Sequence, residues 1–305
     1  MKEITLSDIP TRVLGRTGLE VTVLGFGAME LRGEGSGRSR PVTPEQADAV
    51  LNGALDSGIN YVDTSIDYGT AEEYIGRFIS SRRSEYYLAS KCGCAVGVPP
   101  PPPGQRVPHV FTRENIVAGV EQSLRRMQTD YLDLVQFHAS PSKEVLEQED
   151  AITTLTELRD AGKIRFLGSS STLPNLADHI DMGVFDVFQI PYSALQREHE
   201  ESISAAARAG AGTVIRGGVA RGEPGEGTGE KETWSQFEEA SLDDLLDGAS
   251  RSEFMLRFTI SHPGLSTTIV GTLNPKHLAE NVVAASKGPL DPEVHAEVKR
   301  RLSAR

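Results

Sequence analysis

Four polar side chains at the ends of strand-like segments have the chemistry to move a proton together. Asp63, Lys91 and His138 each stand at the carboxyl end of an apolar run, and Tyr68 lies in the loop just after the first run. In a parallel barrel the carboxyl ends of the strands converge on one face, so these residues can share one site. A carboxylate, a phenol, an ammonium group and an imidazole are the components of an acid–base catalyst.

The size of the electrostatic effect favours a role for each group. Lowering the phenol pKa by about two units from about 10 needs about 2.7 kcal/mol of preference for the phenolate. An ammonium group about 4 Å away, at an effective dielectric constant of about 20, supplies about 4 kcal/mol. We therefore expect Tyr68 to be the general acid and Lys91 to lower its pKa. Asp63 keeps Lys91 charged away from water, and His138 orients and polarises a substrate oxygen.

Each of these residues also has a simpler explanation when it is taken alone. Asp63 fits a helix or loop cap, Lys91 a solvated strand end, and His138 a satisfied core histidine. Asp67 is expected to be a turn residue. His109 is expected to be exposed, with a place in the pocket as the alternative, so only the complete set favours catalysis.

Three motifs occur in a fixed order along the chain. They are Asp-x-x-x-x-Tyr-Gly at 63–69, a strand ending in Ser-Lys at 90–91, and Leu-Asp-Leu-Val-x-x-His at 132–138. Together they resemble the aldo-keto reductases, a family of (β/α)8 nicotinamide-dependent carbonyl reductases. The resemblance extends from Arg12 to Asn281, which is nearly the whole chain.

The surrounding pattern favours an α/β barrel. A length of 305 residues is normal for one such domain, so we expect a single (β/α)8 TIM barrel over residues 1–305. Residues 12–24 alternate apolar and polar, which predicts an N-terminal β-hairpin or a hairpin running into the first barrel strand. Eight strand-like runs fall at 21–25, 59–63, 86–91, 131–137, 163–168, 186–190, 213–216 and 266–270.

The first helix has a clear amino-terminal signal. Thr43 is placed as the N-cap, with Pro44 at the first helical position and Gln46 completing a capping box. Gly58 marks the end of this helix. The predicted buried face consists of Ala47, Val50, Leu51, Ala54 and Leu55.

Three segments interrupt the alternation and predict long loops on the carboxyl-terminal face. They are the glycine-rich 33–37, the proline run at 98–103, and the insertion 217–250. Because such loops border barrel active sites, the last two are candidates for substrate selection, with a disordered surface loop as the alternative. Trp234 in the insertion is expected either to close over a ligand or to pack the loop.

Charge and apolar content exclude several functional classes. The net charge of -12 argues against nucleic acid or an anionic membrane as a partner. No membrane-spanning run or signal-peptide core is visible, so we expect a cytoplasmic protein. Cys92 and Cys94 are too close for a stabilising disulfide and too few for a zinc site, so we expect no metal. We interpret them as small loop residues, with a reactive thiol as the alternative.

The chain lacks a Rossmann fingerprint but carries a different anion signal. Gly25-x-Gly27 is not followed by the third glycine, because position 30 is Glu. Directly after the last strand, Asn274 as N-cap and Pro275 begin a helix whose free N–H groups favour a phosphate. Lys276 adds positive charge there.

The resemblance implies which residues contact the cofactor. It places three groups of residues in contact with the cofactor. The first lies along the cofactor, the second binds the nicotinamide amide, and the third binds the phosphates. In the second group, Ser171 replaces a usual Asn. Because Gly271 and His277 occupy positions where relatives place basic residues, NADPH is expected from the family and NADH remains possible. The three groups are Gly27, Ala28 and Met29; Ser170, Ser171 and Gln189; and Gly271, Thr272, Asn274, Lys276, His277 and Asn281.

Arg216 departs from the family, in which many relatives carry a tyrosine that stacks under the nicotinamide ring. A guanidinium group also stacks on flat rings, but it repels the positively charged oxidised nicotinamide. We hypothesise that Arg216 stacks or pairs with a cofactor phosphate, and that the bound cofactor is biased to the reduced form.

The expected function is therefore NADPH-dependent reduction of a small-molecule aldehyde or ketone by hydride transfer, with Tyr68 as the proton donor. One alternative is a nicotinamide-binding regulatory or complex-forming subunit with little turnover. Another is a phosphate-binding barrel lyase or isomerase without nicotinamide. The sequence names neither the carbonyl substrate nor the oligomeric state.

Overall fold

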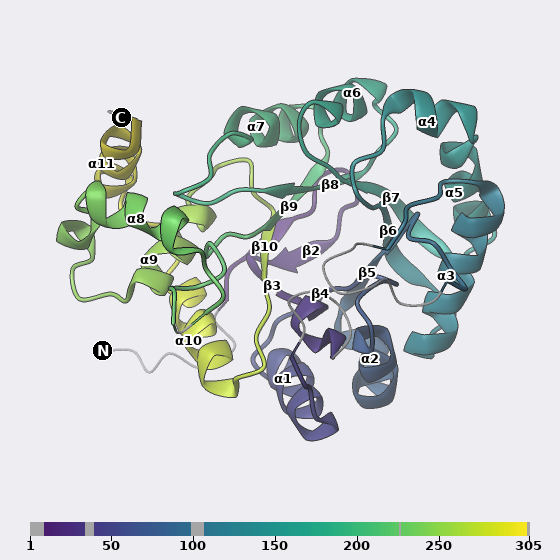
Figure 1. The fold of residues 1–305 in the computed structure, drawn as a ribbon, viewed down its shortest axis with the longest axis horizontal. Coiled ribbons are helices and arrows are strands. Elements are labelled where there is room, and N and C mark those ends of the chain that lie inside the picture. The colour runs from purple at the N-terminus through teal and green to yellow at the C-terminus, as the bar shows by residue number, and fades with distance from the viewer. Residues whose placement is uncertain (1–8, 34–39, 99–106, 226, 304–305) are drawn as a thin grey trace.

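The computed structural model describes residues 9–33, 40–98, 107–225 and 227–303, and within them eight parallel strands close into a barrel. The strand order around the barrel is β10-β3-β4-β5-β6-β7-β8-β9. Figure 1 shows the strands in the middle of the molecule with helices around them. The predicted (β/α)8 fold is confirmed. The barrel strands are β3 (Leu24–Gly27), β4 (Tyr61–Asp63), β5 (Tyr87–Cys92), β6 (Leu132–Phe137), β7 (Ile164–Ser170), β8 (Val187–Pro191), β9 (Gly212–Arg216) and β10 (Thr267–Val270).

Helices follow the strands and cover the outside of the barrel (Figure 1). Three short 3₁₀ helices, at Ala28–Arg32, Ser80–Glu85 and Leu242–Leu245, occur beside them. Among the described helices, none combines the length and apolarity that crossing a membrane requires. The α-helices are α1 (Pro44–Asp56), α2 (Ala71–Ile79), α3 (Arg113–Met127), α4 (Lys143–Gln148), α5 (Ala151–Asp160), α6 (Asn175–Met182), α7 (Glu200–Arg208), α8 (Lys231–Glu239), α9 (Arg251–Ile260), α10 (Pro275–Ser286) and α11 (Pro292–Ser303).

The predicted hairpin precedes the barrel and closes one of its ends. Strands β1 (Thr11–Val13) and β2 (Glu20–Thr22) pair antiparallel, so the predicted run 21–25 is divided between β2 and β3. Leu14, Leu19 and Val21 are buried against residues of the barrel interior. A backbone bridge from Gly15 to Ala211, directly before β9, places the hairpin at the amino ends of the strands. The hairpin thus leaves the carboxyl ends of the barrel strands uncovered.

The insertion after β9 is folded rather than extended. It contains α8 and the 3₁₀ helix Leu242–Leu245. The Trp234 indole is buried, packs on Phe237 and donates to the Ala220 carbonyl at 3.3 Å. Trp234 therefore packs the insertion, which is the second of the two predicted roles. Most of the other two predicted loops, 34–37 and 99–103, lies outside the described residues.

The beginning of α1 follows the sequence signal. The Thr43 hydroxyl accepts from Gln46 N at 3.2 Å, and the Gln46 side chain accepts from Thr43 N at 3.0 Å. The five predicted apolar positions are all buried. Local hydrogen bonding and the apolar face therefore agree on where this helix starts and how it is oriented.

We predict that Thr43→Ala lowers the free energy of unfolding by about 1 kcal/mol, because it removes the capping oxygen of α1. Urea denaturation measures the loss, and Thr43→Ser, which keeps the hydroxyl, serves as the control. Equal stabilities of the alanine and serine variants would show that the cap contributes nothing.

Candidate functional site

A buried ion pair lies at the carboxyl ends of β4 and β5. Lys91 Nζ is 2.6 Å from Asp63 Oδ1 and also donates to the Thr64 carbonyl at 2.7 Å. Both side chains are 1–2% exposed. Burial opposes the charge on Lys91, but Asp63 first and then Tyr68 raise its pKa above the usual value. The expected anchoring of Lys91 by Asp63 is therefore what the geometry shows.

Two amides complete the coordination of Asp63. Gln136 on β6 and Gln189 on β8 donate to Asp63 Oδ2 at 3.0 and 2.8 Å. Ser170, at the end of β7, donates to Gln189 Oε1 at 3.3 Å. The sequence reasoning missed Gln136, although a polar residue inside an apolar strand is a signal that points to a site. Both oxygens of the Asp63 carboxylate are therefore paired, one by Lys91 and the other by the two amides.

Tyr68 lies next to this pair. Lys91 Nζ is 5.0 Å from the centroid of the Tyr68 ring. Burial raises the pKa of the phenol above its usual value, while Lys91 and, more weakly, Arg216 act in the opposite direction. The sequence argument expected a net lowering by about two units. It found the right sign for Lys91 but left out the desolvation of the phenol, which outweighs it.

His138 stands directly after β6 and faces Tyr68 edge to face, with ring centroids 6.1 Å apart. Burial lowers the pKa of its imidazole to about 3, so the ring is neutral at physiological pH. Its Nδ1 edge faces Cys94 Sγ at 3.1 Å and Ser65 Oγ at 3.5 Å. A neutral ring whose Nδ1 accepts a hydrogen bond from the Cys94 thiol carries its own proton on Nε2.

The residues expected at the nicotinamide amide differ in their surroundings. Ser170 and Gln189 belong to the Asp63 network, but the Ser171 hydroxyl bonds to Ser169 and lies 2.8 Å from His179 Nδ1. Ser171 is fully buried and its hydroxyl already has these two partners, so its contact with the cofactor stays a prediction. In contrast, Gln136 Oε1 is buried without a partner among the described residues, and a carboxamide N–H would satisfy it.

The residues expected at the phosphates gather around the start of α10. Asn274 Oδ1 accepts from Lys276 N, and Thr272 Oγ1 accepts from Asn274 N, both at 3.0 Å. The Lys276 ammonium group is exposed and lies 3.7 Å from Glu280. His277 and Asn281 are half-buried on the same helix. This capped helix start, beside the strand end, has the chemistry of an anion site.

The end of β3 packs directly on the loop after β10. A Cβ added to Gly271 would lie 2.3 Å from the Gly27 carbonyl, so only glycine fits at Gly271. Ala28 is buried and Met29 is half-buried in the turn that follows Gly27. These backbones therefore form the rim between the reacting residues and α10, where the resemblance expects the cofactor. The unpartnered Gln136 Oε1 and the capped start of α10 are groups that fit a nicotinamide dinucleotide.

Arg216 ends β9 on the same face. Its positive charge lowers the pKa values of Tyr68 and His138, although burial has the larger effect on both. Arg216 therefore adds a minor positive potential at Tyr68 and His138.

Loop residues around His138 form a polar group that the sequence did not reveal. Asp67, Cys94 and His109 bring their side chains to His138, and the possible ligand atoms of all four lie within 4.8 Å of one another. His109 is half-buried and thus is not the exposed residue that was expected; it takes the alternative place beside the site. Burial raises the pKa of the Cys94 thiol, so it stays protonated in the absence of another partner.

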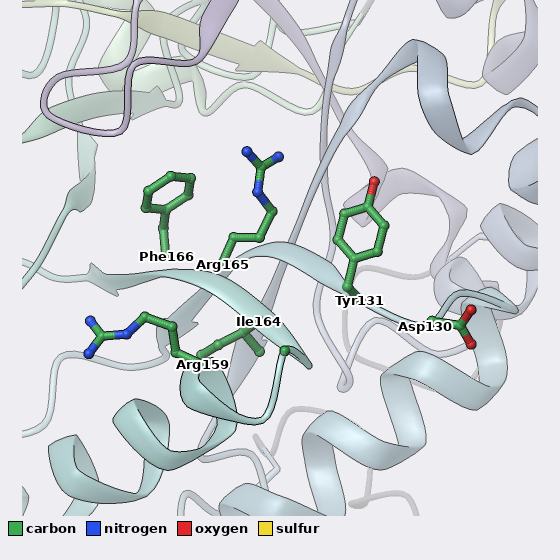
Figure 2. A pocket seen from close by; sticks show the side chains of 7 residues that line it. Asp130, Tyr131, Arg159, Ile164, Arg165 and Phe166 are labelled. Atoms are coloured by element: carbon green, nitrogen blue, oxygen red, sulfur yellow. The ribbon is translucent and has the colours of Figure 1, made fainter.

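A depression of about 600 Å³ lies at the opposite end of the barrel and contains none of the predicted residues. Figure 2 shows its lining side chains at the amino ends of β6 and β7. Active sites in parallel barrels lie at the carboxyl ends, so this depression is not the catalytic site. Its lining residues are Asp130, Tyr131, Arg159, Gly162, Ile164, Arg165 and Phe166.

Comparison with known proteins agrees with the fold and shows the family. Residues 23–302 match the family model described as Aldo/keto reductase family. The chain is 27% identical to the uncharacterized oxidoreductase YqkF of Bacillus subtilis, over 92% of this chain and 93% of that protein. It is 26% identical to a putative voltage-gated potassium channel subunit beta of Schizosaccharomyces pombe, over 97% and 94% of the two chains. The holo form of aldo-keto reductase AKR11C1 from Bacillus halodurans superposes with a TM-score of 0.82, at 27% identity over 96% of both chains.

We predict strong coupling between Asp63 and Lys91. Lys91→Met leaves a buried carboxylate uncompensated, and Asp63→Asn does the same to the ammonium group, so each should lower the free energy of unfolding by about 3–5 kcal/mol. The double variant contains no unpaired charge, so its loss should be smaller than the sum of the two by more than about 1 kcal/mol. Chemical denaturation of all four proteins measures this, and additive losses would contradict the buried ion pair.

Proposed function

Because the chain belongs to the aldo/keto reductase family, we propose that it reduces an aldehyde or ketone to an alcohol with NADPH as the reductant. The family consists of NAD(P)H-dependent oxidoreductases. The observation that carries the proposal is the contact of Tyr68 with the buried Lys91–Asp63 pair, next to a neutral His138. This group has a proton donor, a fixed positive charge and a neutral hydrogen-bond donor in one place.

When bound, the cofactor supplies the hydride that adds to the carbonyl carbon. Tyr68 donates its proton to the oxygen of the developing alkoxide. Lys91 stabilises the phenolate that forms on Tyr68, since its charge is fixed and shielded from water. His138 directs Nε2–H at the same oxygen and so orients the carbonyl before the reaction and stabilises charge during it.

Ser170 and Gln189 are proposed to hold the carboxamide of the nicotinamide ring. Ser170 donates to Gln189, and Gln189 donates to Asp63, so that contact is connected to the ion pair. Gly271, Thr272, Asn274 and the start of α10 are proposed for the phosphates. NADPH is preferred over NADH on family grounds, and Lys276 with His277 and Asn281 supplies the polar groups for a 2′-phosphate.

Oxidation of NADPH in the presence of a panel of simple aldehydes tests the proposal. We expect the wild-type protein to turn over at least one of them and Tyr68→Phe to lose a factor of about 10²–10⁴ in kcat while its affinity for NADPH is unchanged. Tyr87→Phe, at the amino end of the strand that carries Lys91, is the matched control and should stay active.

Two results would contradict this mechanism. Full activity of Tyr68→Phe would remove Tyr68 from the reaction. NADPH binding without turnover of any carbonyl compound would favour the regulatory subunit, a role consistent with the similarity to a channel beta subunit.

We further predict that Arg216 biases binding toward the reduced cofactor, because its charge repels the cationic oxidised ring. Arg216→Ala should shift the ratio of the Kd values for NADPH and NADP+ toward the oxidised form by about tenfold, which corresponds to about 1.4 kcal/mol. Fluorescence titration with both forms measures the ratio. An unchanged ratio would show that the Arg216 charge does not discriminate between the reduced and the oxidised cofactor.

A further inference from the structure

We propose that Asp67, Cys94, His109 and His138 form a binding site for a divalent cation of the zinc class. The four residues come from four separate segments: the loop after β4, the loop after β5, the segment before α3, and the end of β6. Their ligand atoms nevertheless lie within 4.8 Å of one another. A thiol, two imidazoles and a carboxylate are the ligand types that zinc takes in four-coordinate sites.

The distances between the ligand atoms suit a tetrahedral ion. Cys94 Sγ is 3.1 Å from His138 Nδ1 and 3.6 Å from His109 Nε2. Asp67 Oδ1 is 3.6 Å from His138 Nδ1. With Zn–S near 2.3 Å and Zn–N near 2.0–2.1 Å, tetrahedral ligands are separated by about 3.3–3.6 Å. These three separations are close to the tetrahedral values, and because the whole group spans no more than 4.8 Å, side-chain rotations are enough to close it around an ion.

The backbone holds Cys94 and His109, two of the four ligands, opposite each other. Cys94 and His109 are paired in an antiparallel bridge. On either side of it, Ala95 N donates to Pro108 O at 2.8 Å, and Val110 N donates to Gly93 O at 2.6 Å. These backbone hydrogen bonds fix the spacing of the Cys94 and His109 side chains before an ion binds.

A side chain from α3 fixes the same loop from behind. Asn115 donates to the carbonyls of Cys94 and Val110 at 3.2 and 2.7 Å, and it accepts from Val96 N at 2.9 Å. On the other side, Ser65 donates to the Asp67 carboxylate and so orients it. Hydrogen bonds of this kind, one layer outside the ligands, are typical of metal sites.

The charges balance when the ion is bound. Lys91 and Arg216 place positive charge near His138 and so oppose a cation. Asp67 carries one negative charge, and Cys94 gains another when its S–H bond breaks, the sulfur binds the ion and the proton leaves to solvent. The two negative charges neutralise a divalent ion, whereas a site without the thiolate would remain positive. Cys94 is thus the ligand on which binding most depends.

The site is compatible with the proposed function and does not depend on it. The ion takes Nδ1 of His138, and Nε2 keeps its proton for a substrate oxygen. A bound ion would therefore fix the same tautomer that the Cys94 thiol favours. Because the test below measures metal binding alone, its outcome is separate from that of the reductase assay.

The test uses the full chain after treatment with a chelator, titrated with Co²⁺ and then with Zn²⁺. We expect one Co²⁺ per chain, an intense thiolate-to-cobalt charge-transfer band, visible bands of tetrahedral strength, and displacement of all of them by Zn²⁺. Cys94→Ser should lose the charge-transfer band. His109→Ala should keep it but bind Zn²⁺ at least about tenfold more weakly, measured by competition with a chromophoric chelator.

Cys92→Ser provides the matched control, because Cys92 is buried two positions away and does not belong to the four-residue group. It should bind both ions like the wild type. Absence of the charge-transfer band in the wild-type protein would overturn the proposal. So would equal Zn²⁺ affinities of wild type and His109→Ala, a variant on a half-buried loop that tests the site even where Cys94→Ser does not fold.

Discussion

The arrangement of the site depends on the buried ion pair of Asp63 and Lys91. Two isolated charges at this depth would be strongly unfavourable, so each oxygen of Asp63 must be paired, and it is, by Lys91, Gln136 and Gln189. Asp63 and its three partners together belong to four different strands, β4, β5, β6 and β8. The ion pair therefore fixes the relative positions of the strand ends, and Tyr68 takes its place against a charge that cannot move.

Much of the fold could be predicted because its signals are local. The capping box of Thr43 and Gln46 needs only residues three apart, and the apolar face of α1 follows from the helical period. The division of 21–25 between β2 and β3 could not be predicted, because these residues form one continuous strand-like run and only the pairing partners of its two parts differ. The path of 217–250 was equally hidden, since burial of Trp234 depends on Phe237 and Ala220, within a segment of low apolar content.

The sequence could bring the residues proposed for catalysis together because parallel strand ends must converge, but it could not predict their environments. The sequence predicts that Lys91 lies near Tyr68, but it does not reveal how far burial removes the phenol from water. The predicted sign of the Tyr68 pKa shift was therefore wrong. The resemblance places Ser171 at the cofactor, but it does not reveal that the Ser171 hydroxyl hydrogen-bonds to His179. Cys94 and His109 meet through an antiparallel bridge that no sequence period indicates, and their spacing matches no metal motif. Contacts set by loop paths leave no periodic signal.

The raised pKa of Tyr68 and the fixed charge of Lys91 serve different stages of the proposed reaction. Before the reaction the phenol must hold its proton, and burial ensures this. During the reaction a negative charge develops on the phenol oxygen, and Lys91 then contributes a stabilisation that the neutral phenol does not receive to the same extent. An interaction that strengthens as charge develops lowers the barrier and not merely the energy of the bound state. If the site lowered the pKa of Tyr68 before the reaction, part of the phenol would be deprotonated and could not donate. Desolvation, which keeps the phenol protonated, and Lys91, which stabilises the phenolate, are therefore more effective together than either alone.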